Sequence, residues 1–178
     1  MPRTVELVSY NPEWPKIFQQ EARLIADIFS NELVSIHHIG STAIPNMLAK
    51  PIIDIMGVVR EIERVELYNG SMIKLGYTPR GEYGIPERRY FIKATQGIRS
   101  HHVHMYPMGH RNISLHLDFR DYLQEHPKQA KAYIQFKKDL AQQYRQDPSA
   151  YSEAKTEFVE STNKLAARWR KKKKLGRI

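Results

Sequence analysis

Residues 38–55 read HIGSTAIPNMLAKPIIDI, and this stretch decides the fold. The segment Leu33–Ile39 is rich in β-branched residues and is followed by Gly40-Ser41, which predicts a strand that ends at a turn. The run Ile52–Val59 is almost continuously apolar, which predicts a strand covered on both faces. Asp54 is a charged residue within that second run. We therefore expect the functional site where these two strands meet.

The sequence around this stretch predicts a helix before it and both strands and helices after it. Apolar residues recur with helical spacing from Trp14 to Phe29. Gln96-Gly97 predicts a hairpin-like turn, which makes the strands on either side antiparallel. Beyond about residue 112 the apolar spacing is purely helical, with breaks at His126-Pro127 and Asp147-Pro148. The remaining expected elements are a helix at 62–75, weakened at Asn69-Gly70, and strands at 77–80, 88–94 and 101–106.

This order of elements predicts an α/β (α+β) fold built on a mixed sheet. We expect a core over residues 1–112, a helical segment over 113–170 packed on it, and a basic tail over 171–178. The 178 residues are 41% hydrophobic and 26% charged, near the averages for globular proteins. Because no apolar run reaches about 18 residues, no membrane span is expected. The first residues lack the apolar core of a signal peptide, so a cytoplasmic location is expected. The absence of cysteine excludes a disulfide scaffold and a thiolate zinc site.

The net charge of +9 comes mostly from one end of the chain. Residues 168–178 hold seven Lys or Arg and no acid, and the rest of the chain has 21 basic and 19 acidic residues. A block of like charges at a terminus is usually disordered, which predicts a solvated tail. The alternative is that this tail binds nucleic acid or another anionic surface.

The residues around the first turn are suited to phosphate chemistry. Gly40 would let a phosphate approach the backbone, the hydroxyls of Ser41 and Thr42 could hold its oxygens, and Lys50 could neutralise it. Asp54, within an apolar strand, needs an ionic partner or a cation. In the alternative interpretation Gly40 only makes a turn, Ser41 or Thr42 caps a helix, and Asp54 pairs with a neighbouring Arg or His. The spacing alone leaves both interpretations open.

Histidines and arginines gather on the later strands. His102 and His104 share a strand face, and Asp54 lies on a strand that could neighbour theirs. Two imidazoles and one carboxylate suit a divalent metal, whereas the alternative is a set of hydrogen-bonded polar residues. Arg88 and Arg99 could bind phosphate or carboxylate in bidentate fashion. The other histidines, which we expect at the surface or satisfied in the core, are His37, His38, His110, His116 and His126.

Phe119-Arg120-Asp121-Tyr122 lies on an expected helix. Adjacent helical positions do not face each other, so Arg120 and Asp121 are expected to reach different partners. The favoured interpretation is a structural clamp from the helix to the sheet, and a ligand-facing Arg120 is the alternative.

Several motifs together resemble the GrpB-like family, a poorly characterised group with a nucleotidyltransferase-like fold. The resemblance extends from Tyr10 to Lys155. The motifs are His38–Pro45, Lys50–Ile55, Leu75-Gly76-Tyr77, His102-Val103-His104 and Phe119–Leu123. In the wider nucleotidyltransferase superfamily, Gly-Ser after the first strand holds nucleotide phosphates. Two carboxylates one residue apart on the second strand bind divalent metal, and a third comes from a later strand.

The resemblance implies roles for specific residues, with one departure. Gly40-Ser41 and Asp54 match the first two features, but the second carboxylate falls at Met56, and residues 103–105 offer no acid for the third. A two-metal mechanism needs carboxylates that hold both ions, so this departure counts against adenylyl-type transfer.

The leading hypothesis is a protein that binds a nucleotide or phosphate-bearing small molecule and acts as a nucleotidyl- or phosphotransferase with Asp54 as catalytic residue. One alternative is a metal-dependent enzyme of another class, with Mg, Mn or Zn held by Asp54, His102 and His104. The other is a non-catalytic nucleic-acid-binding module that uses the basic tail. The expected phosphate-binding residues are Gly40, Ser41, Thr42, Lys50, Arg88 and Arg99.

Overall fold

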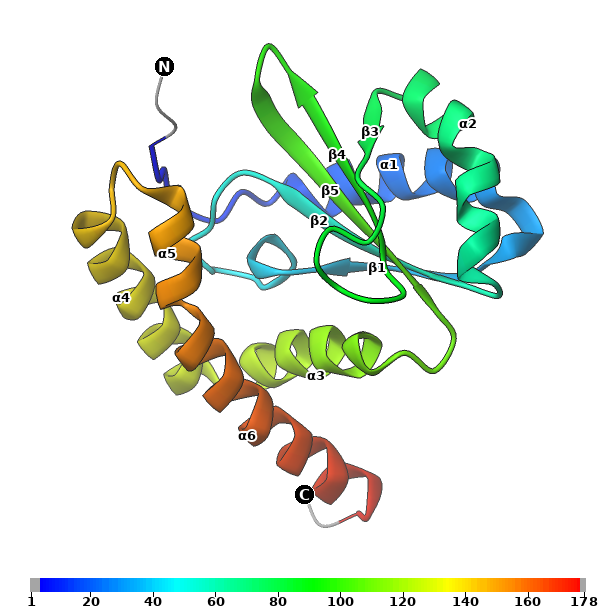
Figure 1. Cartoon of the computed structure of the whole chain (residues 1–178). Helices are drawn as coiled ribbons and strands as arrows, with labels where there is room; N and C mark the ends of the chain where they lie inside the picture. Colours follow the sequence, from blue (N-terminus) through cyan, green and yellow to red (C-terminus); the bar gives the residue numbers. More distant parts are fainter. Residues whose placement is uncertain (1–3, 177–178) are drawn as a thin grey trace.

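The computed structural model describes residues 4–176 and has a mixed α+β fold, as predicted (Figure 1). Its centre is a five-stranded sheet with strand order β1-β2-β5-β4-β3. β2 and β5 are parallel, and the other neighbouring pairs are antiparallel. The strands are β1 (Leu33–Ile39), β2 (Ile53–Val59), β3 (Tyr77–Pro79), β4 (Arg89–Thr95) and β5 (Ile98–Pro107). The predicted strands are therefore confirmed within three residues at each end.

The parallel pairing of β2 with β5 brings the candidate site residues together. Asp54 lies opposite His102 in the register of the two strands, and Met56 lies opposite His104. The odd-numbered neighbours of Asp54 on β2 face the main apolar core, so its own side chain faces the other side of the sheet. Asp54 and the two histidines are consequently on one face; the spacing had predicted this for the two histidines and had placed Asp54 on a strand that could neighbour theirs.

The main core lies between the other face of the sheet and the helices α1 (Trp14–Phe29) and α2 (Asn69–Lys74). The helix expected at 62–75 is α-helical only over α2, and Ile62–Tyr68 forms a 3₁₀ helix. Ile62 and Val65 are the buried residues of this 3₁₀ helix. They stand three positions apart, which is the period of a 3₁₀ helix, and this explains the difference from the prediction.

The C-terminal third is helical, and it covers the face that carries Asp54 (Figure 1). Asp147 begins α5 by accepting hydrogen bonds from the backbone N–H groups of Ser149 and Ala150, at 3.1 and 3.0 Å. The apolar stripe that follows Pro148 predicted one helix, but the helix is interrupted at Lys155, between α5 and α6. The helices are α3 (Arg111–Glu125), α4 (Pro127–Gln143), α5 (Pro148–Ala154) and α6 (Thr156–Lys174). No helix within residues 4–176 is long and apolar enough to cross a membrane.

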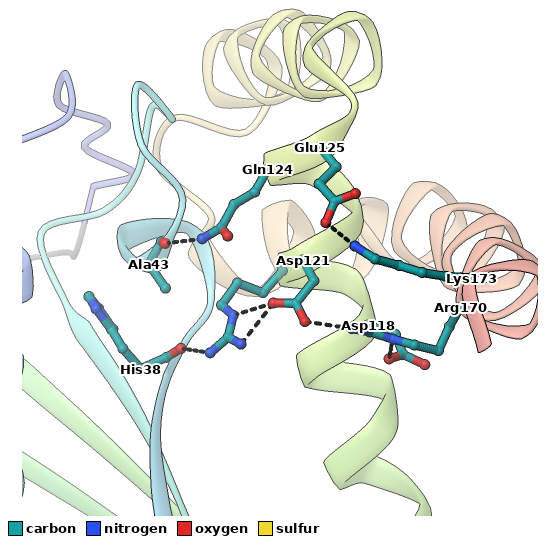
Figure 2. A network of polar contacts seen from close by, with 9 residues as sticks. His38, Ala43, Asp118, Asp121, Gln124, Glu125, Arg170 and Lys173 are labelled. Carbon is teal, nitrogen blue, oxygen red and sulfur yellow. Dashed lines mark hydrogen bonds and ion pairs between the residues drawn. The ribbon is translucent and has the colours of Figure 1, made fainter. Parts of the chain in front are cut away.

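The basic tail differs from the prediction because most of it is part of α6. Lys171–Lys174 are exposed, as expected of solvated residues, but they form the last turn of the helix. Arg170 pairs with Asp118 on α3 at 2.7 Å, and Lys173 pairs with Glu125 (Figure 2). Acidic residues of α3 thus compensate part of the positive charge and dock this end of α6 on the body. Arg177 and Ile178 lie outside the described residues.

Candidate functional site

Asp54 and the two predicted histidines form one contact group. His102 Nδ1 donates a hydrogen bond to Asp54 Oδ1 at 3.2 Å, and His104 Nε2 lies 3.8 Å from the same oxygen. Burial alone would raise the pKa of Asp54, but the hydrogen bonds from His102 and His104 hold it well below its usual range. The carboxylate is therefore ionised at neutral pH.

His104 uses both of its ring nitrogens. Arg88 Nη1 donates to His104 Nδ1 at 3.5 Å, so the ring proton is on Nε2, on the side of Asp54. Burial lowers the pKa of His104, which keeps this imidazole neutral. His102 differs, because its Nε2 is buried without a hydrogen-bond partner among the described residues.

The turn after β1 requires glycine at position 40. Gly40 has a φ of 72°, and a Cβ there would lie 2.7 Å from Asp54 Oδ2. This close approach brings Ser41 and Thr42 beside Asp54. The Thr42 hydroxyl is already satisfied, since it donates to the Ile52 carbonyl at 3.4 Å and lies 2.9 Å from His38 Nε2. The Ser41 hydroxyl also has a protein partner, since it accepts from Lys137 Nζ at 3.1 Å.

A cavity of about 210 Å³, the lysine cavity, opens beside this turn. It brings together Lys50, which the sequence predicted, with Lys137 of α4 and Lys155 at the break between α5 and α6. Among the described residues, Asp54 is the only acidic side chain in its lining. The other lining residues are Leu7, Ser41, Thr42, Ala49, Ile52, His102, Tyr151 and Ser152.

Polar and aromatic contacts hold the three lysines in place. Lys137 is only 2% exposed, and its Nζ donates to Ser41 Oγ at 3.1 Å and to the Leu48 carbonyl. Lys50 and Lys155 both lie over the ring of Tyr151, with Nζ 4.6 and 5.1 Å from its centroid. These ring contacts are favourable for a cation but leave its charge uncompensated by an anion.

Burial lowers the pKa values of all three lysines. Burial lowers the pKa of Lys137 to about 7, with a further contribution from the charge of Lys155. Burial, followed by the charges of Lys155 and Arg99, lowers the pKa of Lys50 to about 8. Burial also lowers the pKa of Lys155. A bound anion would reverse this effect, because it would favour the protonated form of each lysine.

A second cavity of about 400 Å³ adjoins the first and shares Ser41, Asp54 and Lys155 with it. This neighbouring cavity has more apolar walls, and His116 contributes a ring whose pKa burial lowers to about 4. Its remaining lining residues are Gly40, Ile85, Asn112, Leu115, Phe119, Tyr133, Val159 and Asn163. We call the two cavities together the cleft: it has one cationic end and one largely uncharged end.

The two predicted phosphate-binding arginines lie in different places. Arg88 is buried, and its guanidinium donates to the carbonyls of Glu82 and Tyr83 at 3.1 and 2.6 Å. It is not among the residues that line the cleft, so its contacts fit the positioning of the 82–87 loop. Arg99 lines a separate hollow that shares Lys50 and Ile52 with the lysine cavity, at the edge of the site.

Arg120 and Asp121 behave differently from the prediction. Arg120 Nε donates to Asp121 Oδ1 at 2.8 Å, although the two residues are adjacent on α3. The arginine side chain is long enough to bend back along the helix, which the spacing rule does not consider. Arg120 Nη1 also donates to the His38 carbonyl of β1 at 3.0 Å, so the predicted clamp from helix to sheet is confirmed.

The predicted metal ligands Asp54, His102 and His104 contact one another and Arg88. Within residues 4–176, no group of three or more histidine, aspartate or glutamate side chains is arranged to hold a metal ion. Asp54 Oδ1 faces two imidazoles: His102 Nδ1 at 3.2 Å and His104 Nε2 at 3.8 Å, while His104 Nδ1 faces Arg88. Met56, where a second carboxylate would be needed, is fully buried. These contacts favour the alternative of hydrogen-bonded polar residues.

Sequence reasoning missed Lys137, Lys155 and His116. A signal was available for Lys137, because it stands on the apolar stripe between Tyr133 and Leu140, where lysine is unexpected. Lys155 lies within the segment that resembles the GrpB-like family, but nothing in its spacing connects it to Asp54. Both lysines come from helices whose docking on the sheet could not be derived from periodicity.

Comparisons with known proteins give a consistent result. The family model described as "GrpB protein" matches residues 4–165 of this chain. UPF0157 protein YqkA of Bacillus subtilis (strain 168) is 47% identical over 169 residues, which make up 95% of this chain and 49% of that protein. This chain thus spans about half the length of the Bacillus relative. UPF0157 protein BH1888 of Halalkalibacterium halodurans is 34% identical over 92% of this chain and 83% of its own length.

The fold has a solved counterpart. The crystal structure of conserved protein GrpB from Enterococcus faecalis aligns with a TM-score of 0.88 at 38% identity, over 92% of this chain and 98% of that one. Cid1 in complex with the UTP analogue UMPNPP aligns with a TM-score of 0.43 at 11% identity, over 67% of this chain and 37% of its own. The similarity to Cid1 is too weak to carry an argument about function.

Proposed function

The chain belongs to the GrpB family, and from its cleft we propose that it binds a nucleotide or another phosphate-bearing small molecule. The observation that supports this proposal is the convergence of Lys50, Lys137 and Lys155 on one cavity that contains a single carboxylate. Buried positive charges without counterions are unfavourable, and an anionic ligand would remove that cost.

Phosphate is the anion that best matches the donors. Lys137 and the Ser41 hydroxyl lie 3.1 Å apart beside the Gly40 turn, so both could bind neighbouring oxygens of one phosphate group. Lys50 and Lys155 flank the ring of Tyr151 and could reach further oxygens. A set of three cations suits a polyphosphate better than a single carboxylate.

The neighbouring cavity would hold the rest of the ligand. Its walls include Leu115, Phe119 and Val159, and amide side chains from Asn112 and Asn163 reach its lining. Asn163 Oδ1 is buried without a hydrogen-bond partner among the described residues, so it could accept from a ligand donor. A heterocyclic base fits this combination of apolar walls and amides.

Asp54 lies where the two cavities meet, so it would face the junction between the phosphates and the rest of a bound nucleotide. It remains the residue that we propose as catalytic for nucleotidyl or phosphoryl transfer. Its ionised carboxylate could accept a hydrogen bond from an attacking hydroxyl group.

Calorimetric titration with ATP, pyrophosphate and inorganic phosphate tests the proposal. We expect ATP to bind, and Lys137→Met to weaken its binding by about tenfold or more because a charge-assisted hydrogen bond is lost. Lys138→Met is the matched control, since Lys138 is exposed on the same helix, and it should leave the affinity unchanged. If none of the three ligands binds, or if both variants weaken binding equally, the proposal is wrong.

A further inference from the structure

We propose that the cleft takes its polyphosphate ligand as the metal-free anion, with lysines in place of the divalent cation that usually accompanies such ligands. This inference rests on the proposed function. It concerns whether the site selects the metal-free or the metal-bound polyphosphate. It follows from the hydrogen-bond donors and the charges around Asp54.

The charges around the cleft favour an anion over a cation. Lys50, Lys137 and Lys155 face it, and of the residues that the structure describes, Asp54 is the only acidic one in the lining of either cavity. A divalent cation would therefore enter a region with more positive than negative charge and would be repelled. The free polyphosphate would gain from all three ammonium groups.

The oxygen donors needed for a divalent cation are also missing. Magnesium prefers an octahedron of oxygen ligands, usually with one or two carboxylates and several waters. Asp54 Oδ1 is engaged by His102 and by the proton-bearing Nε2 of His104. Asp54 Oδ2 faces the Gly40 turn, where even a Cβ atom would come within 2.7 Å of it. Asp54 would therefore offer a cation at most one oxygen that is free of a histidine contact, and the described lining holds no second carboxylate to complete its shell.

Lysines can supply the countercharge themselves. An ammonium group is a compact cation with three donors and binds phosphate oxygens as a point charge. Lys137 is held by Ser41 and the Leu48 carbonyl, and Tyr151 lies beneath both Lys50 and Lys155. The three groups are thus preorganised by the fold, and little side-chain entropy is lost when the ligand binds.

The two ways of binding predict opposite effects for Asp54→Asn. If the ligand is metal-free, the charge of Asp54 repels the phosphates in the bound complex, so its replacement by the neutral isostere should tighten binding severalfold, even though the same change would remove the proposed catalytic group. If a cation bridges Asp54 and the phosphates, the same change removes the only charged ligand and should weaken binding. Asp139→Asn on the exposed face of α4 is the matched control and should have no effect.

The experiment is calorimetric titration of the full chain with ATP and with inorganic triphosphate, once in excess EDTA and once in excess magnesium. We expect each probe to bind at least as tightly in EDTA as in magnesium, and Asp54→Asn to bind more tightly than the unaltered protein. Binding that needs magnesium and is lost in Asp54→Asn would overturn the inference and leave the proposed function intact. Absence of binding in both media would overturn both. If Asp54→Asn does not fold, the comparison of the two media on the unaltered protein decides the question.

Discussion

Two regions of this protein join its helices to its sheet with charged side chains, and they use those charges in opposite ways. In the α3–α6 clamp, formed by Asp118, Arg120, Asp121 and Arg170, every charged group has an opposite partner within hydrogen-bond distance (Figure 2). In the lysine cavity, three ammonium groups face one carboxylate, and that carboxylate is already engaged by histidines.

Because of this difference, we expect one region to contribute mainly to stability and the other mainly to ligand binding. The clamp is complete without a ligand, so its charges hold α3 and α6 together and its loss should appear as lower stability. The lysine cavity is incomplete without a ligand, because Lys137 is buried, Lys50 and Lys155 are partly buried, and the described lining offers the three cations one carboxylate. Changes there should appear first in ligand affinity, and the free protein should tolerate them or even gain stability.

The largest expected effect is on binding. Lys155→Met should weaken the affinity for ATP by about 10- to 100-fold, since it removes a charge-assisted hydrogen bond at the point shared by both cavities. Calorimetric titration measures the change. Lys164→Met, on the exposed face of α6, should bind ATP normally, and an equal loss in that control would place the ligand elsewhere.

The next effect is on stability. Arg170→Met should destabilise the fold by about 1–2 kcal/mol, because Asp118 loses its partner and Asp121 keeps only Arg120. In a chain of this size that corresponds to a fall in Tm of about 2–8 °C, with ATP affinity unchanged. Differential scanning calorimetry measures the shift. A variant that keeps its Tm but loses binding would contradict the division between the two regions.

A smaller effect is expected on the pH dependence of stability. The pKa of Lys137 is about 7 in the fold against an ordinary value of 10.5. Between these two pH values the unfolded chain binds a proton that the folded protein has released, so stability rises with pH over this window. Below about pH 7, Lys137 is protonated in both the folded and the unfolded state, so it no longer makes stability depend on pH.

Melting curves measured from about pH 7 to about pH 9 test this for the free protein. Lys137→Met should flatten the rise, whereas Lys138→Met should retain it. An equal slope in all three proteins would mean that Lys137 is not the buried group that releases the proton.

The smallest effect concerns the basic end of α6. Deletion of residues 171–178 should lower Tm by less than about 4 °C, because the pair it removes, Lys173 with Glu125, is exposed on both sides. Any affinity for nucleic acid should fall, and its dependence on salt should weaken. A larger fall in Tm would show that this last turn belongs with the clamp.

The sequence predicted the sheet and the group around Asp54 well, for physical reasons that are local. The strand at Leu33–Ile39 was predicted with the bounds that the structure shows, because its β-branched run ends at a Gly-Ser turn. His102 and His104 were predicted on one face because strand alternation is a fixed period, and Asp54 was predicted on a strand that could neighbour theirs. Once the two strands are neighbours, the parallel pairing of β2 with β5 brings the three side chains together.

The features that the sequence did not predict depend on how distant helices dock. Lys155 lies at a one-residue break between α5 and α6, and the continuous apolar stripe gives no sign of that break. The docking of α6 depends on Asp118, Asp121 and Glu125, which share one face of α3 at helical spacing. That acidic stripe was readable in the sequence, but its basic partner some 50 residues away was not.

A crystal structure of the protein with bound ATP is the measurement that tests the central claim most directly. We expect phosphate oxygens within hydrogen-bond distance of Nζ of Lys50, Lys137 and Lys155, beside the Ser41 hydroxyl. An ATP molecule bound elsewhere, with no phosphate in the lysine cavity, would contradict the account.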